Sequence, residues 1–155
     1  MTSKTLWERL REHWLAQNIT IKPGVHEEAL SRFETLYTVL LPRDLREYFL
    51  VMNGMREGTT DEELIRFWSL EEVKSISEES PAYSTPDYLP EADSFFLFAD
   101  YSIWAHAYSI RISNNSSQPN PVYVIGGTKP VPIADSFSEF VDLYLDGKCL
   151  DFQVV

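Results

Sequence analysis

The segment "LPRDLREYFLVMNG", residues 41–54, predicts one short helix with a defined beginning and end. Pro42 suits a first helical turn, because the N–H group that proline lacks would have no partner there. Gly54 suits the left-handed position that commonly follows a helix, and Asn53 precedes it. Three apolar residues recur at helical spacing and predict a buried face: Leu45, Phe49 and Met52. The segment therefore predicts a core helix that is closed by Asn53 and Gly54.

The composition around this helix is that of a soluble globular protein. The chain has 155 residues, of which 44% are hydrophobic and 24% charged. Because a chain of this length buries roughly 70% of its unfolded surface, we expect one domain over residues 1–155. Cys149 is the only cysteine, which excludes an intrachain disulfide and a cysteine-based zinc site.

The beginning of the chain does not resemble a targeting sequence. Residues 1–18 carry charges throughout and lack the apolar centre of a signal peptide. No run in the sequence approaches the roughly 18 apolar residues that span a membrane. We therefore expect a cytoplasmic protein that does not bind membranes.

The net charge of −11 is concentrated in one part of the chain. Residues 57–100 contain 12 acidic and 2 basic residues, whereas residues 1–56 contain 7 acidic and 8 basic ones. An acidic surface repels nucleic acid and membranes and attracts basic partners. Charge alone leaves open the alternative that these residues only keep the protein soluble.

Local patterns predict the order of helices and strands. Capping boxes indicate helix starts at Thr5–Glu8, Ser69–Glu72 and Ser136–Glu139. A further helix carries a buried face formed by Ala29, Leu30, Phe33 and either Leu36 or Tyr37. Strands are expected at residues 64–68, 95–99, 104–113, 122–125 and 131–134. Helices near both ends with consecutive strands between them predict an α+β fold: a largely antiparallel central sheet of about four to six strands, with N-terminal and C-terminal helices packed on it.

Two segments between these elements carry more specific expectations. In the strand at 104–113, period-2 alternation places Trp104, His106 and Tyr108 on one face. Residues 77–93 contain three prolines within an acidic stretch, which excludes a regular helix and predicts a long loop. Long loops in compact domains are often functional.

The sequence offers no established catalytic or metal-binding pattern. The three histidines lie on separate predicted elements, and none belongs to a spaced metal motif. His106 lies near Asp100 in sequence, so a hydrolytic pair is one hypothesis. The alternative is a neutral histidine within an aromatic cluster. Lys148 adjoins Cys149 and could activate that thiol, although a structural thiol after the last helix is the simpler interpretation. We predict no enzyme activity, no metal and no cofactor.

Five segments together resemble the SUKH superfamily, which includes fungal cell-wall-synthesis regulators and bacterial immunity proteins of polymorphic toxin systems. The 41–54 segment resembles the hallmark helix of that superfamily, which begins with Leu-Pro and ends with Asn-Gly. The other four are "FWSLEEV" (67–73), "FFLFADYSIWAHAYSIRI" (95–112), "PVYVI" (121–125) and "IADSFSEFVDLYL" (133–145). Their order is kept across residues 26–147. The chain departs from the superfamily in its long acidic 77–93 loop and in Arg111, where many relatives carry an acidic residue.

The resemblance implies a domain that binds protein partners and is not an enzyme. In the immunity branch the partner is a toxin domain, frequently a nuclease or a deaminase. Toxins that bind phosphate backbones are often basic, so an acidic inhibitor can approach them quickly and cover their active sites. The alternative is an intracellular adaptor or scaffold that binds endogenous proteins, as the fungal regulators do. No nucleic-acid partner is expected.

For either role, acidic residues interspersed with aromatic ones are the candidate partner-binding region, because interface hot spots usually have this composition. The candidates are Asp61, Glu62, Glu63, Glu78, Glu79, Tyr83, Asp87, Tyr88, Glu91 and Asp93. Tyr101 is a further candidate aromatic residue. Each acid taken singly has the simpler interpretation of a solvated surface charge, so the hypothesis concerns the patch as a whole.

Overall fold

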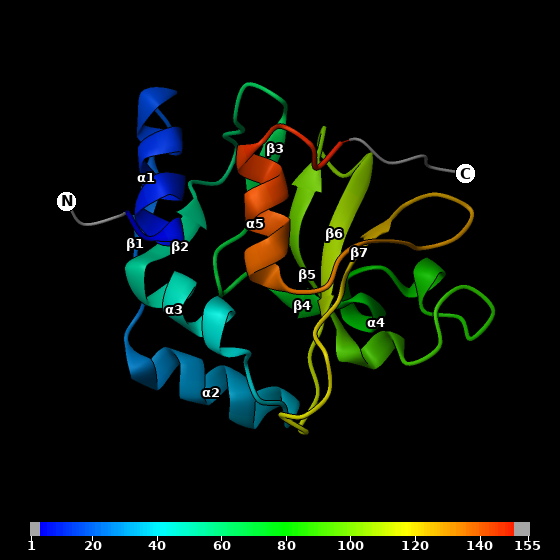
Figure 1. Cartoon of the computed structure of the whole chain (residues 1–155). Helices are drawn as coiled ribbons and strands as arrows, with labels where there is room; N and C mark the ends of the chain where they lie inside the picture. Colours follow the sequence, from blue (N-terminus) through cyan, green and yellow to red (C-terminus); the bar gives the residue numbers. More distant parts are fainter. Residues whose placement is uncertain (1–3, 151–155) are drawn as a thin grey trace.

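The computed structural model describes residues 4–150, with helices near both ends and most of the strands in consecutive runs between them (Figure 1). The helices are α1 (Leu6–Ala16), α2 (Glu27–Tyr37), α3 (Arg43–Val51), α4 (Ile76–Glu79) and α5 (Phe137–Leu145), with 3-10 turns η1 (Pro81–Tyr83) and η2 (Ala92–Ser94). The strands are β1 (Ile21–Pro23), β2 (Met52–Met55), β3 (Ile65–Phe67), β4 (Lys74–Ser75), β5 (Phe95–Tyr101), β6 (His106–Arg111), β7 (Val122–Ile125) and β8 (Val131–Ala134).

The main sheet has six strands, and every pairing in it is antiparallel. Its order is β3-β5-β6-β7-β8, and β4 pairs with β5 at the opposite end from β3. Strands β1 and β2 form a separate antiparallel pair. The predicted α+β fold, with a largely antiparallel sheet and helices packed on it, is therefore confirmed.

The sheet is covered on both faces. On one face, α1, α2, α3 and α5 contribute to a large core in which Phe67 is central: its ring lies 5.0 Å from that of Trp14 and 4.9 Å from that of Tyr144, centroid to centroid. On the other face, α4 and the 81–93 loop cover a smaller core that includes Trp68 and Leu97. Figure 1 shows α5 over β5 and β6 and α4 on the far side of the sheet from α1.

The start of β6 corrects the expectation for residues 104–113. Strand β6 begins at His106, and Trp104 belongs to the preceding turn. Tyr108 packs in the larger core, whereas Trp104 packs against the smaller one, so these two residues do not share a face. The prediction was wrong only for the residues before His106, because within β6 the alternation holds: Tyr108 and Ile110 lie in the larger core and Ala107 in the smaller one.

The helix expected within residues 41–54 forms as α3, but it ends earlier than the sequence predicts. The helix stops at Val51, and Met52–Met55 continues as a buried strand instead of a last helical turn. The Asn53 side chain accepts a hydrogen bond from the Leu70 backbone N–H at 2.7 Å and donates to the Glu71 carboxylate at 3.1 Å. Gly54 has φ +73°, and a Cβ atom there would lie 2.5 Å from the Trp68 carbonyl oxygen.

Two of the three predicted capping boxes start helices. Thr5 accepts a hydrogen bond from the Glu8 backbone N–H, and Ser136 accepts one from the Glu139 backbone N–H, both at 3.1 Å. The prediction at Ser69–Glu72 was wrong, because that segment is a turn and α4 begins only after Ser75. The chain cannot stay helical there, since Lys74 and Ser75 pair with β5.

The helices also settle smaller points of the sequence analysis. On α1 the buried residues are Trp7, Leu10 and Trp14. On α2, Tyr37 packs against the core, whereas Leu36 is 75% exposed. Within residues 4–150, no helix is long and apolar enough to cross a membrane.

We predict that Gly54→Ala lowers the free energy of unfolding by about 2–4 kcal/mol, because the new methyl group meets backbone atoms and the backbone is left-handed. Gly58→Ala is the matched control. Gly58 has φ +77° but nothing within 4 Å of its added Cβ, so it should lose only about 1 kcal/mol. Urea denaturation of both variants measures the difference, and equal losses would contradict the role of the close approach.

Candidate partner-binding surface

The predicted acidic residues fall into two separate groups. Ile65 pairs with Tyr101 at one end of β5, and Ser75 pairs with Phe96 near the other end. Five residues of strand span about 17 Å, so the acids before β3 and those after β4 lie at opposite ends of the sheet. We call Glu57, Glu62 and Glu63 the first acidic group. We call Glu78, Glu79, Asp87, Glu91 and Asp93 the second acidic group. Figure 1 shows the loop before β3 and helix α4 at these two ends.

Asp61 lies inside the protein and does not belong to either exposed group. Its side chain is 6% exposed, and one carboxylate oxygen accepts hydrogen bonds from the backbone N–H groups of Glu63 at 2.8 Å and Ile65 at 2.9 Å. The other oxygen accepts from the Tyr144 hydroxyl, which in turn accepts from the Trp14 indole N–H at 2.9 Å. Burial raises the pKa of Tyr144, so this hydroxyl keeps its proton for the bond. Asp61 therefore fixes the 57–64 loop to α1 and α5.

Glu91 is paired, whereas its neighbours in the second acidic group are not. Its carboxylate lies 3.0 Å from the Arg111 guanidinium, so the unusual arginine at position 111 has an acidic partner. The other six predicted acids are exposed and form no ion pair with a lysine or arginine in the described part of the chain: Glu62, Glu63, Glu78, Glu79, Asp87 and Asp93.

Glu78 also interacts with Tyr37, the last residue of α2. Burial and a hydrogen bond to the Glu78 carboxylate raise the pKa of Tyr37 to about 12. The Glu78 backbone N–H donates a hydrogen bond to the hydroxyl oxygen of Ser75, the N-cap residue of α4, at 3.3 Å. Glu78 is therefore an exposed acid whose position is fixed at the start of α4.

The candidate aromatic residues are half-buried and hold the 81–93 loop against the sheet. The Tyr83 ring lies 5.0 Å from that of Tyr88 and stacks on that of Trp104 at 6.0 Å with an interplanar angle of 8°. The Gly126 backbone N–H donates to the Tyr88 hydroxyl at 3.2 Å. Tyr83, Tyr88 and Trp104 thus form one aromatic row that begins in the loop and ends at the turn between β5 and β6.

A pocket of about 520 Å³ lies beside this row, between the 57–64 loop and the β5–β6 turn. Its lining residues are Gly58, Thr59, Thr60, Leu64, Arg66, Asp100, Ser102, Ile103 and Trp104. None of the ten candidate residues lines it. The sequence analysis missed the pocket because the residues that form it come from three separate segments of ordinary composition.

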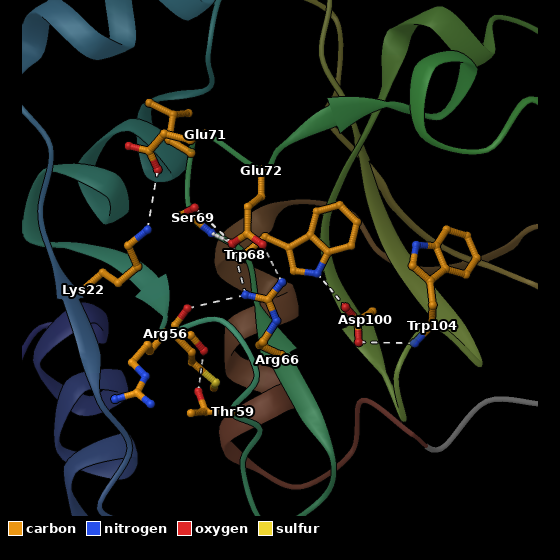
Figure 2. Close-up of polar contacts among 12 residues, drawn as sticks. Lys22, Arg56, Thr59, Arg66, Trp68, Ser69, Glu71, Glu72, Asp100 and Trp104 are labelled. Carbon is orange, nitrogen blue, oxygen red and sulfur yellow. Dashed lines mark hydrogen bonds and ion pairs between the residues drawn. The ribbon is translucent and has the colours of Figure 1, made fainter.

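Two charged side chains from adjacent strands, Arg66 and Asp100, line the floor of the pocket, and Figure 2 shows their polar contacts. Arg66 binds both oxygens of the Glu72 carboxylate, at 3.0 Å and 2.6 Å, which compensates its charge. Asp100 is 8% exposed, and one of its oxygens accepts from the Trp68 indole N–H at 2.6 Å. Its other oxygen has a single long contact of 3.4 Å with the Trp104 backbone N–H.

The turn that forms one wall of the pocket has an unusual backbone. Ser102, Ile103 and Trp104 have φ values of +51°, +54° and +66°. Three successive non-glycine residues in this region are costly, and a β-branched residue such as isoleucine is least suited to it. The turn is held at its ends, since Ala105 N–H donates to the Tyr101 carbonyl at 2.8 Å. The Ile103 side chain at its tip is 91% exposed.

The structure does not bring His106 and Asp100 together. Asp100 pairs with Ala107 in the ladder between β5 and β6, and His106 pairs with Tyr101. Since adjacent strand residues point to opposite faces, the carboxylate and the imidazole lie on opposite sides of the sheet. The His106 ring stacks on Tyr101 at 5.7 Å with an interplanar angle of 11°. This arrangement matches an aromatic cluster and excludes the hydrolytic pair.

Other reactive groups do not form a site in the described chain. Cys149 is 1% exposed, and burial raises the pKa of its thiol to about 12, so it stays protonated at neutral pH. Among residues 4–150, no three His, Cys, Asp or Glu side chains lie together in a way that could hold a metal ion.

The fold is that of a small α+β domain with helices on both faces of an antiparallel sheet. The chain belongs to the SMI1 / KNR4 family (SUKH-1), whose family model matches residues 24–143. This family is generally non-catalytic. No curated protein matches the chain.

We predict that Glu72→Gln makes stability less sensitive to acid. Burial opposes ionisation of Glu72, but hydrogen bonds from Arg66 and Ser69 outweigh it and lower the pKa of this carboxyl. A lowered folded-state pKa contributes stability above the unfolded value of about 4.3 and loses it as the pH falls further. The variant should therefore lose about 1–2 kcal/mol at pH 7 and show a shallower decline between about pH 5 and pH 2.

Chemical denaturation across this pH range measures the effect. Glu79→Gln, at an exposed position, is the control for removal of one charge and should stay within about 0.5 kcal/mol of the parent at pH 7. A decline in Glu72→Gln as steep as that of the parent would show that Glu72 is not the acid-sensitive group.

Proposed function

We propose that this protein is a non-catalytic immunity protein that neutralises a basic toxin domain of the nuclease or deaminase type. The observation that carries the proposal is the number of exposed acids with no internal counter-ion. Folding alone does not use these charges, because exposed carboxylates without partners add little to stability and repel one another.

An acidic surface of this kind suits a partner that binds nucleic acid. Nucleic-acid-binding sites carry lysines and arginines that neutralise phosphates. A matching acidic surface accelerates the encounter and can occupy the same site. The two acidic groups lie at opposite ends of one sheet, so a partner could use either group or span both.

A cytoplasmic adaptor that binds endogenous proteins is the second candidate function, and a different surface supports it. Leu36 is 75% exposed and Leu40 is 47% exposed, at the end of α2 and in the link to α3. These apolar residues lie outside both acidic groups. A partner that docks on them would depend little on charge.

We predict that charge reversal at the acidic groups weakens capture of a basic toxin domain. The probes are the purified C-terminal domains of secreted proteins encoded beside this gene. Glu62→Lys with Glu63→Lys tests the first group, and Glu78→Lys with Glu79→Lys tests the second. At least one pair should reduce affinity tenfold or more, and high salt should weaken parental binding.

The control pair is Glu28→Lys with Asp135→Lys, which changes the net charge equally at exposed acids outside both groups. It should retain nearly all binding at moderate salt. Binding that ignores salt and both test pairs would refute the acidic-surface mechanism. Loss on Leu36→Ser in that case would favour the adaptor function.

A further inference from the structure

We infer that the pocket between the 57–64 loop and the β5–β6 turn receives a lysine or arginine side chain of the protein partner, with Ile103 as the apolar anchor beside it. This inference rests on the proposed function, because it assigns the contact that gives the acidic surface its specificity. It concerns residues that the acidic groups do not include.

The first argument is the exposed apolar rim of the pocket. Ile103 is 91% exposed, Leu64 is 49% exposed, and Trp104 is partly exposed at the end of the aromatic row. Apolar and aromatic side chains around a pocket are the usual centre of a protein interface. The long aliphatic stem of a lysine or arginine can pack along such walls while its charged end reaches deeper.

The second argument is the cost of placing isoleucine at the tip. Ile103 has φ +54°, where glycine would be far more favourable, and its side chain contributes almost no buried area. Packing within the domain therefore does not account for this residue. Backbone strain of this kind is concentrated at binding sites, where the surrounding structure holds it in place.

The third argument is the charge that a guest would meet. Arg66 pairs with Glu72 and also interacts electrostatically with Asp100, so these three side chains together carry one net negative charge. Asp100 has one oxygen with only a long contact, which leaves it able to accept a further hydrogen bond. The first acidic group adjoins the pocket lining, since Glu57 precedes Gly58 and Glu63 precedes Leu64. A cation is favoured there, and the Trp104 ring offers it a π-face.

The pocket itself is tested without the partner. The ¹⁵N-labelled protein is titrated with N-acetyl-arginine methylamide and N-acetyl-lysine methylamide, and the norleucine and glutamate analogues serve as neutral and acidic controls. We expect saturable shifts at the amides of Gly58, Thr59 and Ile103 and at the Trp104 indole. The basic probes should bind more tightly than either control. Equal shifts with norleucine, or shifts confined to α4, would overturn the inference.

Asp100→Asn tests the charge on the floor. Asparagine keeps an acceptor for the Trp68 indole N–H, so the fold should be preserved, and thermal unfolding checks this. Affinity for the basic probes should fall fivefold or more. Asp135→Asn, which removes a charge from an exposed acid outside both acidic groups, should bind them as the parent does. Unchanged binding by folded Asp100→Asn would overturn the assignment of this carboxylate.

A pair of glycine variants separates the anchor from the strain. Ile103→Gly and Ser102→Gly both relieve a left-handed residue, so each should raise Tm by roughly 2–4 °C. Only Ile103→Gly removes the apolar tip, and only it should weaken binding of the toxin domain, by about tenfold or more. Parental affinity in Ile103→Gly, or equal loss in Ser102→Gly, would overturn the role of this side chain.

These outcomes are distinguishable from failure of the proposed function. If no toxin domain binds, the proposed function fails, and the probe titration still decides whether the pocket takes a cation. If the charge reversals from glutamate to lysine abolish binding of the toxin domain while Ile103→Gly and Asp100→Asn do not, the proposed function stands and the pocket inference fails.

Discussion

The arrangement of this domain depends most on the hydrogen bonds of the Asn53 side chain. Its carbonyl oxygen binds the Leu70 backbone N–H, and its amide group binds the Glu71 carboxylate. Gly54 then allows the chain to pass within van der Waals contact of the Trp68 backbone. Together they attach the end of α3 to the turn after β3. That turn positions Glu72, which pairs with Arg66 on the pocket floor. The helix end and the pocket are therefore parts of one connected structure.

The two faces of the sheet are covered by cores of different size and construction. The larger core is built from interlocking aromatic rings around Phe67 and supports the fold. The smaller core is covered by a short helix and an irregular loop, which the tyrosines of the aromatic row hold in place. Irregular segments tolerate changes in sequence better than core elements do. The second acidic group occurs on this more variable side, whereas the first lies in the 57–64 loop, which Asp61 fixes to α1 and α5.

The sequence predicted what depends on local chemistry. The fold class, the caps at Thr5 and Ser136 and helix α3 follow from spacing and turn residues, and they were confirmed. The strand starting at Trp104 and the helix starting at Ser69 were wrong, because pairing with β5 decides both segments and that pairing is not local. Among the candidate residues, Asp61 cannot be told from its acidic neighbours in the sequence. Its hydrogen bond with Tyr144, which is far away in the sequence, holds it inside the protein. Nothing in "SIW" at 102–104 signals a left-handed turn, since glycine and asparagine are the usual markers.

The buried chain from Trp14 through Tyr144 to Asp61 has a consequence for how this family varies. Trp14 and Tyr144 both lie outside residues 24–143, the part of the chain that the family has in common, whereas Asp61 lies within it. The shared domain therefore relies on flanking segments of its own chain to set the conformation of a surface loop. The segment that the family model matches and the packed domain therefore do not have the same limits. A change at Trp14 or Tyr144 can thus alter the conformation of the 57–64 loop without altering any residue of the matched segment.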